Sequence, residues 1–211
     1  MSICTVEALG VDCADGHLDA GQIGDVGADT FVLNACSSYE QGQRLVDNGA
    51  IAGVVTLKDV ISSMATKIGR TIARLLNYGF PVGAATNLIQ DTMFSGEHYG
   101  VVGDSNAKLA QTTGGSPEVL KIKQTDGNQF KFCIDTFASW NYDIGSMFTP
   151  HLDKVDRRYV VPGEFGPWTG NKNTLSKYLA HKQIPVIAEG DYYRSDEVSV
   201  SGLLNDLEAD E

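Results

Sequence analysis

The sequence predicts an α/β fold followed by a smaller β-rich extension. Between residues 30 and 104, apolar runs typical of buried strands alternate with segments that have helical spacing, which is the pattern of parallel βαβ units. After residue 112, apolar and polar residues alternate one by one, as in half-buried strands. We therefore expect a mainly parallel sheet within residues 1–111, an α+β extension over residues 112–200 and an acidic tail at 201–211.

The elements of the first region follow from local patterns. Phe31, Val32 and Leu33 form an unbroken apolar run, typical of a buried parallel strand. A helix should follow over residues 39–48, because its spacing is helical and Gly49 suits a helix C-cap. The further elements expected are a buried strand at 50–57, a long amphipathic helix that starts at Ser62 and closes with residues 77–79, a shorter helix from Val82 to about residue 91 and a strand at 98–104.

The extension reads as a small β structure. Residues 112–117 are rich in Thr, Gly, Ser and Pro, which is typical of a linker. Residues 119–125 and 129–138 alternate around the turn residues 126–128, which predicts a β-hairpin, and Cys133 is expected among its apolar, core-facing positions. The remaining elements expected are a strand at 156–161, a short helix at 174–181 and a strand at 184–188.

The charge balance argues against nucleic acid as a partner. The 211-residue chain has a net charge of −11, and its 18 aspartates outnumber its 9 glutamates. A solvated acidic surface explains this composition, and adaptation to high salt is a specific form of it. Binding of nucleic acid is disfavoured, because neutralising phosphates requires clustered Lys and Arg.

Cysteine usage and hydropathy set the expected compartment. Cys4, Cys13, Cys36 and Cys133 form no CxxC pair and no metal-site spacing, so we expect free thiols, no metal and no cofactor. No apolar run has the length of a membrane helix, and the first residues lack the features of a signal peptide. The expected location is cytoplasmic, with no membrane partner.

Cys36 is the residue at which reactive chemistry is most plausible. It follows the apolar run at residues 31–33, so a parallel sheet would deliver it to the carboxyl edge, where function gathers in open α/β sheets. Ser37 and Ser38 after it suit the N-cap of the next helix, whose N-terminus would favour a thiolate. On position alone, an inert core thiol is the favoured interpretation, because free cysteines are among the most buried residues.

Five motifs in register favour a catalytic Cys36 over an inert core thiol. They are an Asp-Gly-x-Leu step at 15–18, Leu-Asn-Ala-Cys at 33–36, Gly-Val-Val-Thr at 53–56, the two helices from Ser62 and Val82, and a strand that ends in Gly-Asp at 103–104. In order and spacing, residues 15–104 resemble the carboxyl half of the CHAT domain, a member of the caspase-like cysteine peptidase fold. The resemblance is closest to CHAT-like proteins of salt-loving archaea, which fits the acidic composition.

The resemblance implies a three-layer αβα fold and a nucleophilic Cys36. This cysteine would attack a peptide carbonyl to form an acyl-enzyme, while backbone N–H groups stabilise the oxyanion. Asn34, Ala35 and Ser37 would line the substrate pocket. Relatives specific for basic residues carry an aspartate two residues before their cysteine, whereas Asn34 is a neutral amide and does not support a preference for Arg or Lys.

The family's histidine ends a strand before the Asp-Gly-x-Leu step, and this chain shows no histidine there. His17 is the nearest candidate base, although its turn context favours a solvated histidine. His98 is expected at the amino side of a parallel strand, away from Cys36, and His151 and His181 lie in the extension without a visible partner. We therefore expect a peptidase that is inactive or very weak.

Three interpretations remain open from the sequence. The chain is a CHAT-type cysteine peptidase whose histidine strand lies upstream of its start, a caspase-like module that binds a protein or peptide without cleaving it, or an unrelated α/β binding protein. If the histidine strand is absent, the sheet exposes an edge that a second copy could cover. A homodimer is therefore a further expectation.

Overall fold

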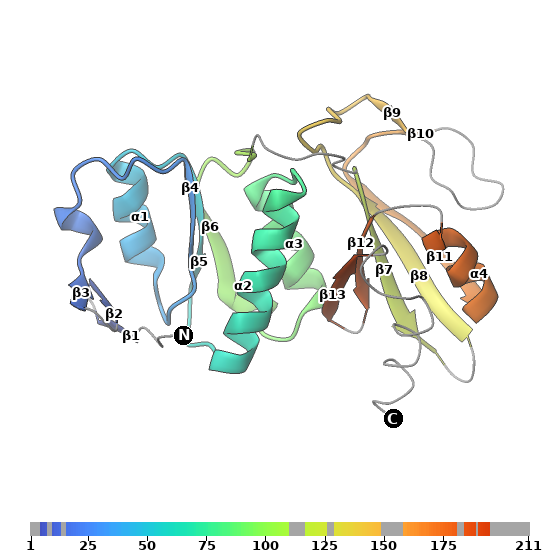
Figure 1. Ribbon diagram of the computed structural model, residues 1–211, viewed down its shortest axis with the longest axis horizontal. Coiled ribbons are helices and arrows are strands. Elements are labelled where there is room, and N and C mark those ends of the chain that lie inside the picture. Colours follow the sequence, from blue (N-terminus) through green and yellow to red (C-terminus); the bar gives the residue numbers. More distant parts are fainter. Residues whose placement is uncertain are drawn as a thin grey trace. The chain divides into compact units, whose positions relative to one another are not determined.

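The computed structural model shows a mixed α/β protein that divides into two compact units, residues 1–111 and residues 112–211. Each unit contains its own sheets and helices (Figure 1). The described residues are 5–7, 10–13, 16–109, 117–125, 129–148, 158–180, 184–188 and 190–194. The expected acidic tail at 201–211, His151 and His181 lie outside these ranges.

The main sheet of the first unit has three strands in the order β4-β5-β6. β4 and β5 are parallel, with Leu33 opposite Val55. β5 and β6 are antiparallel, with Thr56 opposite Tyr99. The three predicted strands are therefore present, but the prediction that the last of them runs parallel is wrong. Their bounds are Thr30–Leu33 for β4, Ala52–Thr56 for β5 and Tyr99–Gly103 for β6.

The direction of β6 follows from the connection that precedes it. Two helices, α2 (Ser62–Asn77) and α3 (Val82–Thr92), lie between β5 and β6. α3 begins beside the far end of β6, where the Gly83 N–H donates to the Ser105 carbonyl over 2.8 Å. One helix would carry the chain to the opposite edge and give a parallel strand. The second helix carries it back, so β6 starts at the edge where β5 ends.

Helices cover both faces of this sheet (Figure 1). α1 (Tyr39–Asp47) packs on one face, and Gly42 allows its close approach, since a Cβ there would lie 2.3 Å from the Val55 side chain. α2 and α3 pack on the other face. The predicted amphipathic pattern of α2 is confirmed, because Ile68, Ile72 and Leu75 are all fully buried.

A small antiparallel meander precedes the main sheet and was not predicted. Its strands pair in the order β1-β2-β3 and are only three or four residues long, too short for a clear period-two pattern. The elements outside the main sheet of this unit are β1 (Thr5–Glu7), β2 (Gly10–Cys13), β3 (Gly16–Leu18), and the short 3₁₀ turns η1 (Ala20–Gln22) and η2 (Gly96–His98).

Gly103, at the end of β6, gives a first prediction. Its φ is +77°, and a Cβ would lie 2.2 Å from the Ile51 carbonyl oxygen, a backbone atom that cannot move aside cheaply. We expect Gly103→Ala to lower the free energy of unfolding by about 1–3 kcal/mol, measured by urea titration. Gly27→Ala is the matched control: its φ is +60° but no atom lies within 4 Å, so it should cost less. An equal loss in both variants would contradict the steric argument.

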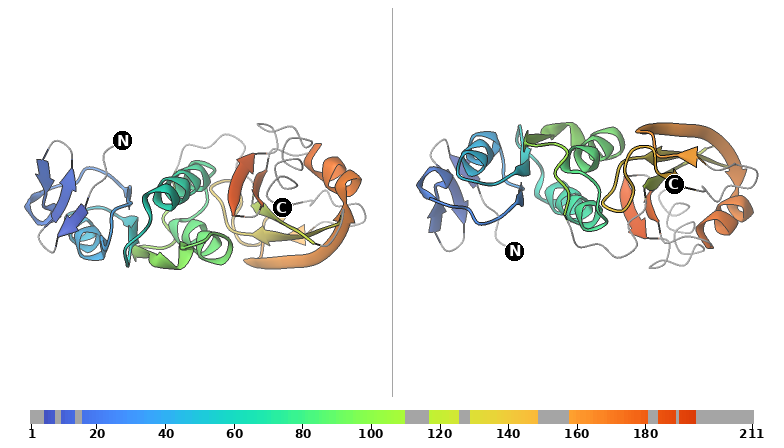
Figure 2. Two further views of the ribbon diagram at one scale, coloured as in Figure 1. Left: turned by 90° about the horizontal axis from the view of Figure 1, so that it is seen from below. Right: turned by 90° about the horizontal axis from the view of Figure 1, so that it is seen from above.

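The second unit is built on a five-stranded sheet in the order β11-β8-β7-β12-β13. The predicted hairpin is confirmed, since β7 and β8 pair antiparallel. β11 is a long, curved edge strand followed directly by α4 (Figure 2). It was not predicted, because its Gly and Pro residues interrupt the alternating pattern of a strand. The bounds are β7 Glu118–Gln124, β8 Gln129–Thr136, β9 Met147–Phe148, β10 Arg158–Tyr159, β11 Gly163–Asn171, α4 Lys172–Ala180, β12 Pro185–Ala188 and β13 Asp191–Arg194.

One face of this sheet forms the core of the second unit. Leu120, Phe130 and Phe132 pack there with Leu175 of α4. Cys133 does not belong to that core: it is partly exposed and lies opposite Lys121, so the prediction that it faces the apolar side is wrong. The reason is the period of the strand, because Phe132 and Ile134 take the buried positions on either side of it.

Candidate functional site

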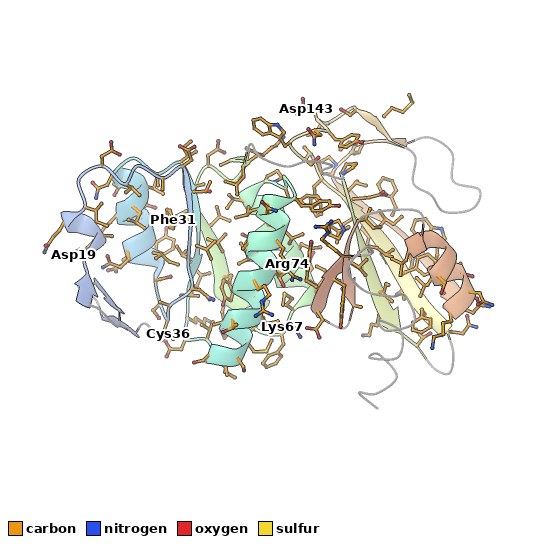
Figure 3. The ribbon with its side chains drawn as sticks, in the orientation of Figure 1. Asp19, Phe31, Cys36, Lys67, Arg74 and Asp143 are labelled. Atoms are coloured by element: carbon orange, nitrogen blue, oxygen red, sulfur yellow. The ribbon has the colours of Figure 1, made fainter. Side chains whose placement is uncertain are left out.

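The turn after β4 holds Cys36 at the carboxyl edge of the parallel pair β4 and β5. The side chain is partly exposed and its Sγ lies 3.9 Å from the Val60 carbonyl oxygen, in the loop between β5 and α2. Figure 3 places Cys36 at the end of the sheet. Ser37, the next residue, has a φ of +52°, which is uncommon for a residue other than glycine. The sequence therefore delivers a thiol to the edge at which it was expected.

Two buried hydroxyl groups fix this turn, and we call them the Ser38–Thr56 clip. Ser38 Oγ donates to the Leu33 carbonyl over 3.0 Å and accepts from the Thr56 N–H over 2.9 Å. Thr56 Oγ1 donates to the Ala35 carbonyl and accepts from the Ser38 N–H over 3.2 Å. Ser38 stands at the N-cap of α1 as predicted, but its hydroxyl makes no cap to that helix. It ties the Cys36 turn to β5 instead.

The clip gives a stability prediction. Valine has the shape of threonine but no hydroxyl, so Thr56→Val leaves the Ala35 carbonyl and the Ser38 N–H without the Thr56 oxygen in a fully buried place. We expect the free energy of unfolding to fall by about 2–4 kcal/mol, measured by urea titration. Thr66→Val is the matched control, because the Thr66 hydroxyl bonds the Ser62 carbonyl on the exposed face of α2 and should change little.

Asn34 and Ala35 face the protein and not the solvent edge. The Asn34 amide donates to the Ala65 carbonyl of α2, and its oxygen accepts from the Tyr99 hydroxyl over 2.6 Å. Ala35 is buried, whereas Ser37 is exposed. Of the three residues expected to line a substrate pocket, Ser37 is therefore exposed, Asn34 is partly exposed and bonded within the protein, and Ala35 is buried.

Tyr99 links the cysteine turn to β6. Its side chain is fully buried, and burial together with the charge of a nearby Cys36 thiolate raises the pKa of the phenol far above its usual range. The phenol thus stays neutral and donates to Asn34 at all working pH values. Its role is to hold the residues before Cys36 in place.

Two of the histidines, His17 and His98, lie within the described residues. His17 is in β3, opposite Asp12, and so belongs to the separate meander. His98 directly precedes β6, and because β6 is antiparallel, His98 lies at the same sheet edge as Cys36. The prediction that His98 lies away from that edge is wrong. Its position follows from the two helices between β5 and β6, a signal that was visible in the sequence.

His98 is held by the loop that also contacts Cys36. Its Nδ1 lies 3.0 Å from the Asp59 carbonyl oxygen, and its Nε2 lies 3.6 Å from the Glu97 carboxylate. The His98 carbonyl accepts from the Leu57 N–H over 2.7 Å, which continues the β5–β6 ladder into the loop. The His98 side chain is 26% exposed. The ring is thus anchored and still reachable from solvent.

Three large apolar side chains are exposed in the segments that adjoin this edge. Leu57 and Ile61 flank the loop after β5, and Phe94 follows α3, with exposed fractions of 45%, 62% and 74%. Large apolar residues exposed together commonly mark a binding surface. The edge therefore combines a thiol, an imidazole and apolar contact area.

No family model matches this chain, and no curated protein matches it. Function has to be argued from the site itself, because one fold supports many activities. Over the described residues, no helix combines the length and the apolar character that crossing a bilayer would require. Within the same ranges, no three His, Cys, Asp or Glu side chains gather into a group that could hold a metal ion.

Proposed function

We propose that this chain is a CHAT-like relative of the caspase-type cysteine peptidases, with Cys36 as its nucleophile. The observation that carries the proposal is the position of Cys36: a partly exposed thiol on a clipped turn, at the carboxyl edge of β4 and β5. Helices on both faces of that sheet are compatible with the three-layer arrangement of the family. The substrate would be a peptide or protein.

The reaction proceeds through an acyl-enzyme. The Cys36 thiolate attacks the peptide carbonyl carbon, a C–S bond forms, and the C–N bond breaks as the amine leaves with a proton. Water then attacks the thioester, which releases the acid and restores the thiol.

The test is cleavage of a broad peptide library by the full chain and by Cys36→Ala. Cleavage that depends on Cys36 supports the proposal, and equal cleavage by both proteins would contradict it. The library also reports the side chain preferred next to the cut bond. Because Asn34 is neutral and engaged internally, we expect no preference for Arg or Lys there.

A second candidate is a peptide-binding module that does not cleave. The exposed apolar residues Leu57, Ile61 and Phe94 at the same edge favour it. In that case wild type and Cys36→Ala would bind the same peptides equally and neither would cut them. Fluorescence anisotropy with labelled library peptides distinguishes the two functions.

A further inference from the structure

We propose that His98 is the general base and acid that serves Cys36. This inference rests on the proposed function and assigns the base to a histidine directly before β6. It concerns a residue that the sequence pattern placed at the wrong edge. Three observations on His98 carry it, namely its topology, its loop contacts and its hydrogen-bonding partners.

Topology brings the two residues to one edge. Cys36 follows the last residue of β4 by three positions, and β4 is parallel to β5. His98 precedes the first residue of β6, which is antiparallel to β5. The end of β4, the end of β5 and the start of β6 therefore lie at the same edge of the sheet, with β5 between the other two.

Both residues also contact one short piece of chain. The Cys36 Sγ lies 3.9 Å from the Val60 carbonyl oxygen, and the His98 Nδ1 lies 3.0 Å from the Asp59 carbonyl oxygen. Ser37, beside Cys36, contacts the Asp59 carboxylate at 3.5 Å. Residues 59 and 60 thus contact both the cysteine turn and the His98 ring.

The hydrogen bond of His98 to the Asp59 carbonyl favours the tautomer in which Nε2 is free to accept a proton. A backbone carbonyl can only accept, so Nδ1 carries the hydrogen and Nε2 of the neutral ring carries the lone pair. An imidazole arranged in this way can take a proton at Nε2. The Glu97 carboxylate lies 3.6 Å from Nε2. The other charged groups of the adjoining loop are Lys58 and Asp59.

The proton steps balance with these groups alone. Nε2 takes the proton of the Cys36 thiol as the sulfur attacks, and the imidazolium gives it to the leaving amine when the C–N bond breaks. In the second half, Nε2 takes a proton from water as the water attacks the thioester, and returns it to the sulfur. Catalytic hydrogen bonds can be long or poorly aligned in a substrate-free enzyme and tighten when substrate binds, so we expect the contact between Nε2 and the Cys36 sulfur to form in the complex with substrate.

The experiment compares wild type with His98→Gln, His98→Ala and His17→Ala, all as the full chain. Glutamine can still donate to the Asp59 carbonyl but cannot exchange a proton near neutral pH, so it preserves the fold while removing the base. We expect peptide cleavage to fall about 10²–10⁴-fold in both His98 variants and to be unchanged in His17→Ala. Added imidazole should restore part of the loss in His98→Ala, which a purely structural role would not produce.

A second measurement keeps the test independent of turnover. The rate at which iodoacetamide alkylates Cys36, followed by mass spectrometry of the Cys36 peptide, is measured from pH 5 to 9. We expect alkylation of Cys36 to be faster in wild type than in His98→Gln over part of this range. Cleavage that needs Cys36 but not His98 would overturn this inference and leave the proposed function standing. If no cleavage depends on Cys36, the proposed function fails, and identical alkylation profiles would overturn the pairing as well.

Discussion

Cys36→Ala is expected to reduce peptide cleavage by about three orders of magnitude, or to the background rate, because the Cys36 sulfur forms the acyl-enzyme in the proposed reaction. The loss should be as large in Cys36→Ser, since a Ser hydroxyl is a far weaker nucleophile than a Cys thiol in a site built for sulfur. Initial rates on a single peptide chosen from the library measure both. Far-UV circular dichroism checks that the variants are folded.

Cys133→Ala is the matched control for that experiment. Cys133 is also a partly exposed free thiol, but burial and the neighbouring Glu164 carboxylate raise its pKa, so it carries little thiolate near neutral pH. We expect Cys133→Ala to cleave as fast as wild type. A loss in Cys133→Ala that equals the loss in Cys36→Ala would mean that the assay reports general thiol chemistry and not the site after β4.

The elements that the sequence predicted well are those with a long or clean pattern. α2 shows apolar residues at steps of three and four over sixteen residues, and the structure buries that face. β7 and β8 alternate around a turn, and they form the expected hairpin. In both cases the local pattern and the final burial agree, so little depends on tertiary context.

The errors share a physical cause, which is that local patterns do not carry strand direction or face. β6 has the composition of a buried strand whether it runs parallel or antiparallel, and only the two preceding helices decide it. That single error moved His98 to the wrong edge of the sheet. Cys133 was assigned to the wrong face because cysteine counts as apolar, although its neighbours in the strand fix the period.

Lys121→Met is expected to lower the free energy of unfolding of the second unit by about 3–5 kcal/mol. The Lys121 ammonium lies 2.8 Å from the Asp135 carboxylate and also contacts the Glu164 carboxylate. The side chain of Asp135 is only 8% exposed, so removing the lysine leaves a buried charge without its main counter-ion. Urea titration measures the loss.

Glu164→Gln is the matched control, because it removes the other carboxylate from the same lysine. Glu164 is 47% exposed, so solvent screens its pair with Lys121 and the variant should lose about 1 kcal/mol or less. The double variant Lys121→Met with Asp135→Leu should recover much of the stability lost in Lys121→Met, since the buried charge is gone. Equal losses in Lys121→Met and Glu164→Gln would contradict the assignment of Asp135 as the dominant partner.

The same cluster predicts how stability depends on pH. Burial lowers the pKa of Lys121, but its hydrogen bonds to Asp135 and Glu164 outweigh burial and hold the pKa above its usual range. Its contribution is therefore complete below the unfolded-state pKa of lysine and is lost as pH rises through the folded-state value. The Lys121 hydrogen bond lowers the pKa of Glu164, whose contribution is present above the unfolded-state pKa of glutamate and is lost as pH falls through the folded-state value. Urea midpoints from pH 3 to 11 should thus decline at both ends in wild type. Lys121→Met should flatten both declines, because it removes the titrating lysine itself and the hydrogen bond that lowers the pKa of Glu164.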